Sequence, residues 1–191
     1  ADGCTSNTWL NDLWATQQLS SPTCAHPPPT KPVNISFAIA LAELAPRAHK
    51  RFAINIGAND GVEHDPTHPL FEAGFAGVAF EGAEQFKAPL AANLAKVNSS
   101  GALHIDWGYA DPGTIAQHLR RAGTPDKPAA LKIDIDSIDL AIMRAILTSG
   151  ISPEVIMAEI NHEIPPPIQW SVKSTPAFRF DLKATWAGYY G

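Results

Sequence analysis

A short glycine loop, Gly57-Ala58-Asn59-Asp60-Gly61, follows directly on the apolar run Phe52–Ile56. Glycines at both ends of a turn allow positive φ angles and let backbone N–H groups approach a ligand with no Cβ in the way. A turn of this kind after a buried strand is typical of a nucleotide-like cofactor site, and a tight turn without a ligand has the same pattern. The loop is therefore a candidate cofactor site, and a tight turn without a ligand is the open alternative.

Asn55 adds to this expectation because it lies inside the apolar run. Strands of a parallel sheet that are buried on both faces read as nearly continuous apolar runs. An amide in such a strand costs free energy unless another group satisfies its hydrogen bonds. A bound cofactor could be that partner, so Asn55 is a candidate cofactor contact.

Polar side chains also stand at the ends of the other apolar runs that read as strands. They are Glu81 at the end of 77–81, Asp134 and Asp136 in 131–136, and Glu159, Asn161 and His162 at the end of 155–160. Because ligands of open parallel sheets bind beyond the carboxyl ends of the strands, we expect these side chains to lie along one edge. Each residue alone could instead lie in a solvated loop or cap a helix, and capping is an open alternative for Asp136.

Glu81 and the loop together favour one class of cofactor over another. An acidic side chain at the end of the second strand is well placed to accept hydrogen bonds from ribose hydroxyls. The loop lacks the G-x-G-x-x-G pattern of nicotinamide folds, and Asp60 would repel a pyrophosphate. A cationic sulfonium cofactor with an amino-acid tail fits these residues better. A nicotinamide-dependent dehydrogenase and a non-catalytic binding protein remain the alternatives.

The elements that would position these residues alternate along the chain. Apolar runs at 52–56, 77–81, 103–105, 131–136 and 155–160 predict strands, and the stretches between them predict helices. This alternation predicts an α/β fold, a doubly wound Rossmann-like parallel sheet with helices on both faces. Residues 1–33 are rich in proline and predict an N-terminal arm and linker, whereas residues 34–191 form the domain.

Four blocks of sequence resemble, in the same order, the FkbM-type branch of the class I S-adenosylmethionine-dependent methyltransferases. The blocks are INIGANDG, the run that ends in Glu81, LKIDIDSID and MAEINHEIPPPIQW, which together span Phe52 to Trp170. The resemblance implies that Gly57, Asn59 and Gly61 line the methionine part of the cofactor. It also implies that Glu81 holds the ribose and that Asp134 lies near the transferred group.

Two features depart from that family. Asn55 stands where its first strand usually carries an acidic residue. The family's sheet usually has seven strands, of which the last two form a hairpin near the C-terminus, and this chain leaves room for one short strand after residue 160. We therefore expect the methyltransferase-like domain to be C-terminally incomplete, with the last strands of the sheet missing.

The resemblance implies an enzyme that methylates a hydroxyl of a small molecule or a carbohydrate. Methyl transfer from a sulfonium requires the acceptor to be held in line and its proton to be removed. His162 and Asp136 are the candidate general bases. In an alternative arrangement, Mg²⁺ that orients the acceptor would be bound by a set of oxygen ligands, Asp134, Asp136, Glu159 and Asn161.

Composition limits the possible partners and compartments. The 191 residues include 14 basic and 19 acidic side chains, a net charge of -5 with no basic run, so we expect no nucleic-acid partner. No apolar stretch reaches the roughly 18 residues of a membrane span. Cys4 and Cys24 could pair, and glycosylation acceptor patterns begin at Asn34 and Asn98, so the secretory lumen and the cytoplasm both remain open. The sequence predicts no particular oligomeric state.

Overall fold

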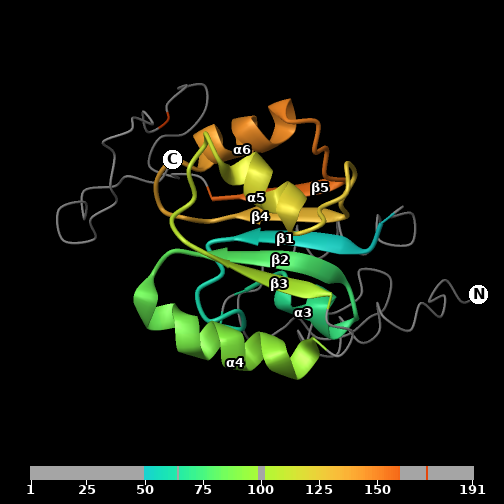
Figure 1. Ribbon diagram of the computed structural model, residues 1–191, viewed down its shortest axis with the longest axis vertical. Helices are drawn as coiled ribbons and strands as arrows, with labels where there is room; N and C mark the ends of the chain where they lie inside the picture. Colours follow the sequence, from blue (N-terminus) through green and yellow to red (C-terminus); the bar gives the residue numbers. More distant parts are fainter. Residues whose placement is uncertain (1–49, 64, 99–101, 160–170, 172–191) are drawn as a thin grey trace, which may run out of the picture.

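A computed structural model describes residues 50–63, 65–98, 102–159 and 171 (Figure 1). In that part of the chain, five parallel strands form one sheet in the order β3-β2-β1-β4-β5. They are β1 (Phe52–Ile56), β2 (Ala76–Glu81), β3 (Leu103–Trp107), β4 (Ala130–Ile133) and β5 (Val155–Ala158). The chain builds outward from β1 to β3 and then crosses back to β4, so β1 and β4 flank the point at which the strand order reverses.

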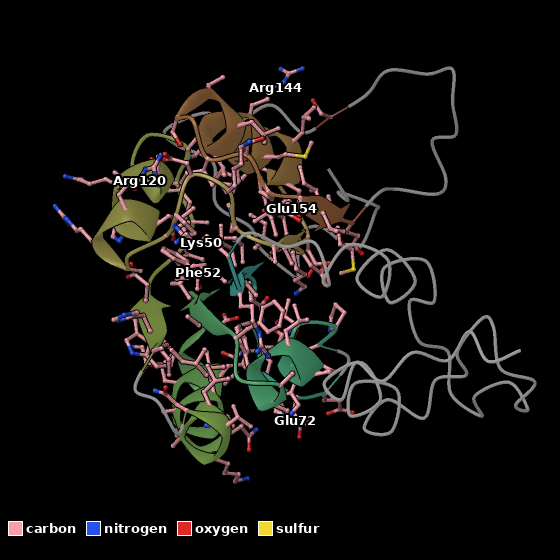
Figure 2. The ribbon with its side chains drawn as sticks, turned by 90° about the vertical axis from the view of Figure 1, so that its right-hand side faces the viewer. Lys50, Phe52, Glu72, Arg120, Arg144 and Glu154 are labelled. Carbon is pink, nitrogen blue, oxygen red and sulfur yellow. The ribbon has the colours of Figure 1, made fainter. Side chains whose placement is uncertain are left out.

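Helices cover both faces of this sheet. One face is covered by α3 (His68–Glu72), the 3-10 turn η2 (Glu84–Phe86) and α4 (Lys87–Val97), and the other by α5 (Ile115–Arg121) and α6 (Asp139–Thr148). Figure 2 shows Phe52 of β1 near the centre, with Arg120 and Arg144 of α5 and α6 toward one end and Glu72 of α3 toward the other. The fold is therefore the doubly wound, Rossmann-like α/β sheet that the alternation of runs predicted.

The residues of β1 divide between the two faces of the sheet. Ile54 and Ile56 pack with the apolar sides of α5 and α6, whereas Ala53 packs with α3 and α4. Burying one large aliphatic side chain contributes about 1.5–3 kcal/mol, so these two clusters hold the layers together. Asn55 shares the face of Ala53 because side chains alternate along a strand. The polar residues of β1 and β4 consequently lie on the side of α3 and α4.

Some predictions fall outside the described residues. The arm and linker at 1–33, with Cys4 and Cys24, lie there, and so do Asn161 and His162. The domain boundary at residue 34 and the missing last strands stay predictions. Among the helices that the structure describes, none combines the length and the apolar character needed to cross a membrane.

Candidate cofactor site

The glycine loop turns sharply because three of its residues have positive φ angles. These angles are 80° at Gly57, 49° at Asn59 and 75° at Gly61. Asparagine is one of the few residues with a side chain that adopts this conformation readily, which accounts for Asn59. The N–H groups of Gly57 and Ala58 both donate to the backbone oxygen of Phe80, at 2.9 and 3.2 Å. The loop therefore passes over the end of β2.

Both glycines of the loop also have close neighbours. A Cβ on Gly57 would stand 1.9 Å from the backbone oxygen of Asp134, just after β4. A Cβ on Gly61 would stand 2.7 Å from Leu90 Cδ1 of α4. The missing side chains thus let the loop rest directly against the end of β4 and against α4. This packing requirement holds with or without a ligand.

Glu81 lies beside the loop, where the sequence predicted it. Its side chain is buried, with 6% of the residue exposed. Oε2 accepts a hydrogen bond from Asn59 N at 2.8 Å, and Oε1 accepts one from Ala83 N at 2.6 Å. A carboxylate has about four lone-pair positions, so each oxygen keeps one acceptor position for a ligand. Glu81 is therefore both a support of the loop and a candidate ligand contact.

Tyr109 lies against Gly82, the residue after Glu81, and sequence reasoning missed it. The residue is 76% exposed, and an ideal Cβ on Gly82 would stand 2.6 Å from Tyr109 Cδ1. Gly108 N donates to the backbone oxygen of Glu81 at 2.9 Å, which holds this segment to the end of β2. The sequence-based strand stopped at residue 105, whereas β3 runs to Trp107 and brings the following aromatic residue to the carboxyl edge. An exposed aromatic ring beside Glu81 is a candidate surface for a flat ligand group.

Asn55 has a partner within the protein. Its residue is fully buried, and its Nδ2 donates to Asp65 Oδ2 at 2.6 Å. Asp65 Oδ1 accepts two more bonds, from the N–H and the hydroxyl of Thr67. The Asn55 Oδ1 atom is buried and has no hydrogen-bond partner within the described part of the chain. Asp65 thus satisfies the amide N–H that the sequence left open to a ligand, and a cofactor contact by Asn55 stays a prediction.

Lys132 lies on β4, directly opposite Asn55 of β1. It is the only buried basic residue among the described residues. Its Nζ donates to the backbone oxygen of Gly57 at 2.5 Å and lies 3.3 Å from Asp134 Oδ2. Burial raises the pKa of Asp65, and the positive charge of Lys132 opposes that rise. A buried ammonium within the LKID run is a second feature that sequence reasoning missed, although a lysine in a buried strand always needs such partners.

Three carboxyl groups gather at the ends of β4 and β5. Asp134, Asp136 and Glu159 each offer an oxygen, and these oxygens all lie within 4.8 Å of one another. Burial, followed by the charges of Asp134 and Asp136, raises the pKa of Glu159 to about 8. Burial and Asp134 likewise raise the pKa of Asp136. We call these three residues the carboxylate cluster. At neutral pH, Glu159 therefore keeps its proton.

The helix-cap alternative for Asp136 does not hold. α6 begins at Asp139, and the carboxylate of Asp139 accepts bonds from Ile135 N and Ser137 N, at 3.1 and 3.0 Å. Asp139 therefore holds the turn that precedes the helix. Asp136 has a φ of 55°, an uncommon conformation that turns the backbone just after β4. Its side chain belongs to the carboxylate cluster instead.

Protein stability is expected to fall as the pH rises from about 5 to about 8 because of Glu159. The pKa of Glu159 rises from 4.5 to about 8 on folding, so over this range the unfolded chain releases a proton that the folded chain keeps. The contribution is fully present below the unfolded value and is lost as the pH passes through the folded value. Thermal denaturation of wild type and Glu159→Gln across this range checks the sign, with the exposed Glu84→Gln as the control. Equal pH slopes for wild type and Glu159→Gln would contradict it.

The structure thus joins several of the residues that the sequence selected. Gly57, Asn59 and Glu81 meet at the loop, and Asp134 connects the loop to the carboxylate cluster through its backbone oxygen and through Lys132. His162 lies outside the described residues.

Comparison with solved structures gives a likeness to the O-methyltransferase from Bacillus cereus in complex with SAH. The likeness has a TM-score of 0.49 and 14% sequence identity, and it covers 82% of this chain and 67% of that chain. No family model matches the chain, and no curated protein matches it. The FkbM-type resemblance accordingly stays a prediction, and the α/β fold rests on the five-stranded parallel sheet and its covering helices.

Proposed function

We propose that the chain binds S-adenosylmethionine at the glycine loop and transfers its methyl group to a hydroxyl of a small-molecule or carbohydrate acceptor. The observation that carries the proposal is the bond between Glu81 and the loop, from Asn59 N to Glu81 Oε2 at 2.8 Å. It keeps a buried carboxylate at the carboxyl edge with acceptor positions left for ribose hydroxyls. Tyr109 offers an exposed ring beside it for the flat base of a nucleoside.

The local charge favours a cationic cofactor over one with a pyrophosphate. Three carboxyl groups interact around the loop with one ammonium group, that of Lys132, and they are Asp65, Asp134 and Asp136. With Glu159 of the carboxylate cluster, acidic groups outnumber basic ones around the loop. A sulfonium with an ammonium tail would be attracted to this site, whereas the phosphates of NAD would be repelled.

The residues of the chain would divide the reaction between them. Bound S-adenosylmethionine supplies a methyl carbon that is already activated by its sulfonium. Glu81 holds the nucleoside end, and the carboxylate cluster lies on the acceptor side. Asp136, whose pKa is raised by burial and by Asp134, and His162, which follows Glu159 by three positions, are the residues proposed to take the hydroxyl proton.

The carboxylate cluster also fits a hard divalent cation. Carboxylate oxygens are the ligands that Mg²⁺ prefers, and an ion there could orient a diol acceptor. The ligands would then be Asp134, Asp136 and Glu159. Asn161, the fourth ligand that the sequence predicts, would join them. This Mg²⁺ requirement is a separate part of the proposal, because cofactor binding at Glu81 does not depend on it.

Calorimetric titration with S-adenosylhomocysteine, NAD and Mg²⁺ tests the proposal. We expect binding of S-adenosylhomocysteine, and Glu81→Gln should weaken it by about 1.5–3 kcal/mol, the range for hydrogen bonds to a charged group. Glu84→Gln, an exposed change three residues along, is the matched control. Wild-type affinity in a folded Glu81→Gln variant would remove Glu81 from the site.

The same titrations separate the alternative functions. Tighter binding of NAD than of S-adenosylhomocysteine would favour a dehydrogenase, and binding without methyl transfer would favour a non-catalytic protein.

A further inference from the structure

Lys132 is a buried charge on β4 whose contacts reach both the glycine loop and the carboxylate cluster. The residue is 2% exposed, and β4 lies between β1 and β5 in the sheet. Removing an ammonium group from water is costly, and good partners must offset that cost. An apolar residue would fill the same position on the strand without that cost. The presence of a charge on an inner strand of the sheet therefore calls for a reason beyond packing.

The partners of Lys132 belong to three different parts of the site. Its Nζ donates to the backbone oxygen of Gly57 at 2.5 Å, within the glycine loop. The same Nζ lies 3.3 Å from Asp134 Oδ2, within the carboxylate cluster. Its charge also acts on the buried Asp65, which holds the amide of Asn55 under the loop. One ammonium group thus connects the loop, the cluster and the buried pair behind them.

These contacts would fix the direction of the loop. Gly57 is in the left-handed region, with a φ of 80°, and its carbonyl points at Lys132 Nζ. The next N–H groups of the loop are held to β2, because Ala58 N donates to Phe80 O and Asn59 N donates to Glu81 Oε2. A charged donor on one side and β2 on the other would hold the loop in one orientation relative to Asp134.

We infer that Lys132 is a positioning residue that sets the glycine loop relative to the carboxylate cluster. The inference rests on the proposed function for its purpose, since it would align the methyl donor at the loop with the acceptor at the cluster. In this role the ammonium group of Lys132 touches neither the methyl donor nor the acceptor. It acts through Gly57 and Asp134, whose positions it fixes.

A double variant tests this role without leaving a buried charge alone. Lys132→Met by itself would strand the carboxylate of Asp65 in the core, so the protein would lose stability for a trivial reason. Lys132→Met with Asp65→Asn removes both charges. The amide oxygen introduced at position 65 can still accept from Thr67. Its nitrogen would face Asn55 Nδ2, so the Asn55 amide must turn over, after which Asn55 Oδ1 accepts from it and Asn55 Nδ2 becomes the unpaired atom. The number of unpaired buried atoms in this pair is then the same as in wild type. Lys127→Met, at an exposed position, is the matched control.

Amide hydrogen exchange of the double variant gives a readout that does not depend on any cofactor. We expect exchange at Ala58 and Asn59 to rise by about tenfold to a hundredfold, the effect of losing a hydrogen bond to a charged group, while exchange at Ile54 in β1 stays within about twofold. Unchanged exchange at the loop in a folded double variant would overturn the inference. An equal rise at Ile54 would also overturn it, because Lys132 would then serve overall stability only.

Calorimetry with S-adenosylhomocysteine separates this inference from the proposed function. We expect the double variant to bind it at least about tenfold more weakly than wild type and Lys127→Met. Equal affinity would show that the position of the loop does not depend on Lys132 and would overturn the inference. If wild type itself gives no binding heat, the proposed function fails, and the exchange experiment still decides whether Lys132 positions the loop.

Discussion

Gly57→Ala is expected to abolish binding of S-adenosylhomocysteine and to destabilise the protein by about 2–5 kcal/mol. The new Cβ would stand 1.9 Å from the backbone oxygen of Asp134, a distance that forces the backbone to move. Overpacking costs about 1–3 kcal/mol, and a left-handed φ costs an L-residue about 1–2 kcal/mol more. Thermal denaturation and calorimetry with S-adenosylhomocysteine measure the two effects.

Gly74→Ala provides a matched control for this experiment. Gly74 has a φ of 79°, almost the same as Gly57, and a Cβ there would meet nothing within 4 Å. We expect this control to lose only the stability that the backbone strain costs and to keep its affinity for S-adenosylhomocysteine. If both variants lose the same stability and both still bind, then the contact of Gly57 with β4 is unimportant and the loop is not the cofactor site.

Replacing the proton acceptor is expected to lower turnover by about 10²–10⁴ with little change in cofactor affinity. For Asp136 the appropriate change is Asp136→Asn, because its φ of 55° is a conformation that asparagine also tolerates. For His162 the change is His162→Ala. Methyl transfer from labelled S-adenosylmethionine to sugars and catechols measures turnover, and calorimetry measures affinity. His104→Ala and Asp126→Asn, both at exposed positions, are the controls.

The two candidates give different outcomes. A large loss in one variant alone assigns the base to that residue. A loss in Asp136→Asn that added Mg²⁺ partly restores would indicate that Asp136 binds the ion. Wild-type turnover in both variants would exclude Asp136 and His162 as the base.

The sequence predicted the sheet well because its strands are separate apolar runs. Buried parallel strands contain few polar residues, so Asn55, Glu81 and Asp134 were visible as exceptions at or near strand ends. Their convergence follows from the parallel direction of the strands alone. The sequence could therefore predict which edge of the sheet carries the polar groups, and the contact of Asn59 N with Glu81 agrees with that prediction.

The parts that the sequence did not predict depend on contacts between distant segments. Asp65 lies in a short polar stretch whose pattern resembles a solvated loop, yet it is buried against Asn55. Lys132 looks like an ordinary strand residue until Gly57 and Asp134 are seen around it. The end of β3 was placed two residues early, since Asp106 interrupts the apolar run, and Tyr109 was overlooked as a result.

The strand order has a consequence for the way this site would assemble during folding. The Asn59–Glu81 bond closes a segment of 22 residues, whereas the Gly57–Lys132 bond closes one of 75 residues. The longer closure costs about 1 kcal/mol more in chain entropy, so the β1–β2 half of the site can form before β4 arrives. A ligand that needs both halves would then stabilise the native state without speeding its formation, and its effect would be seen as slower unfolding.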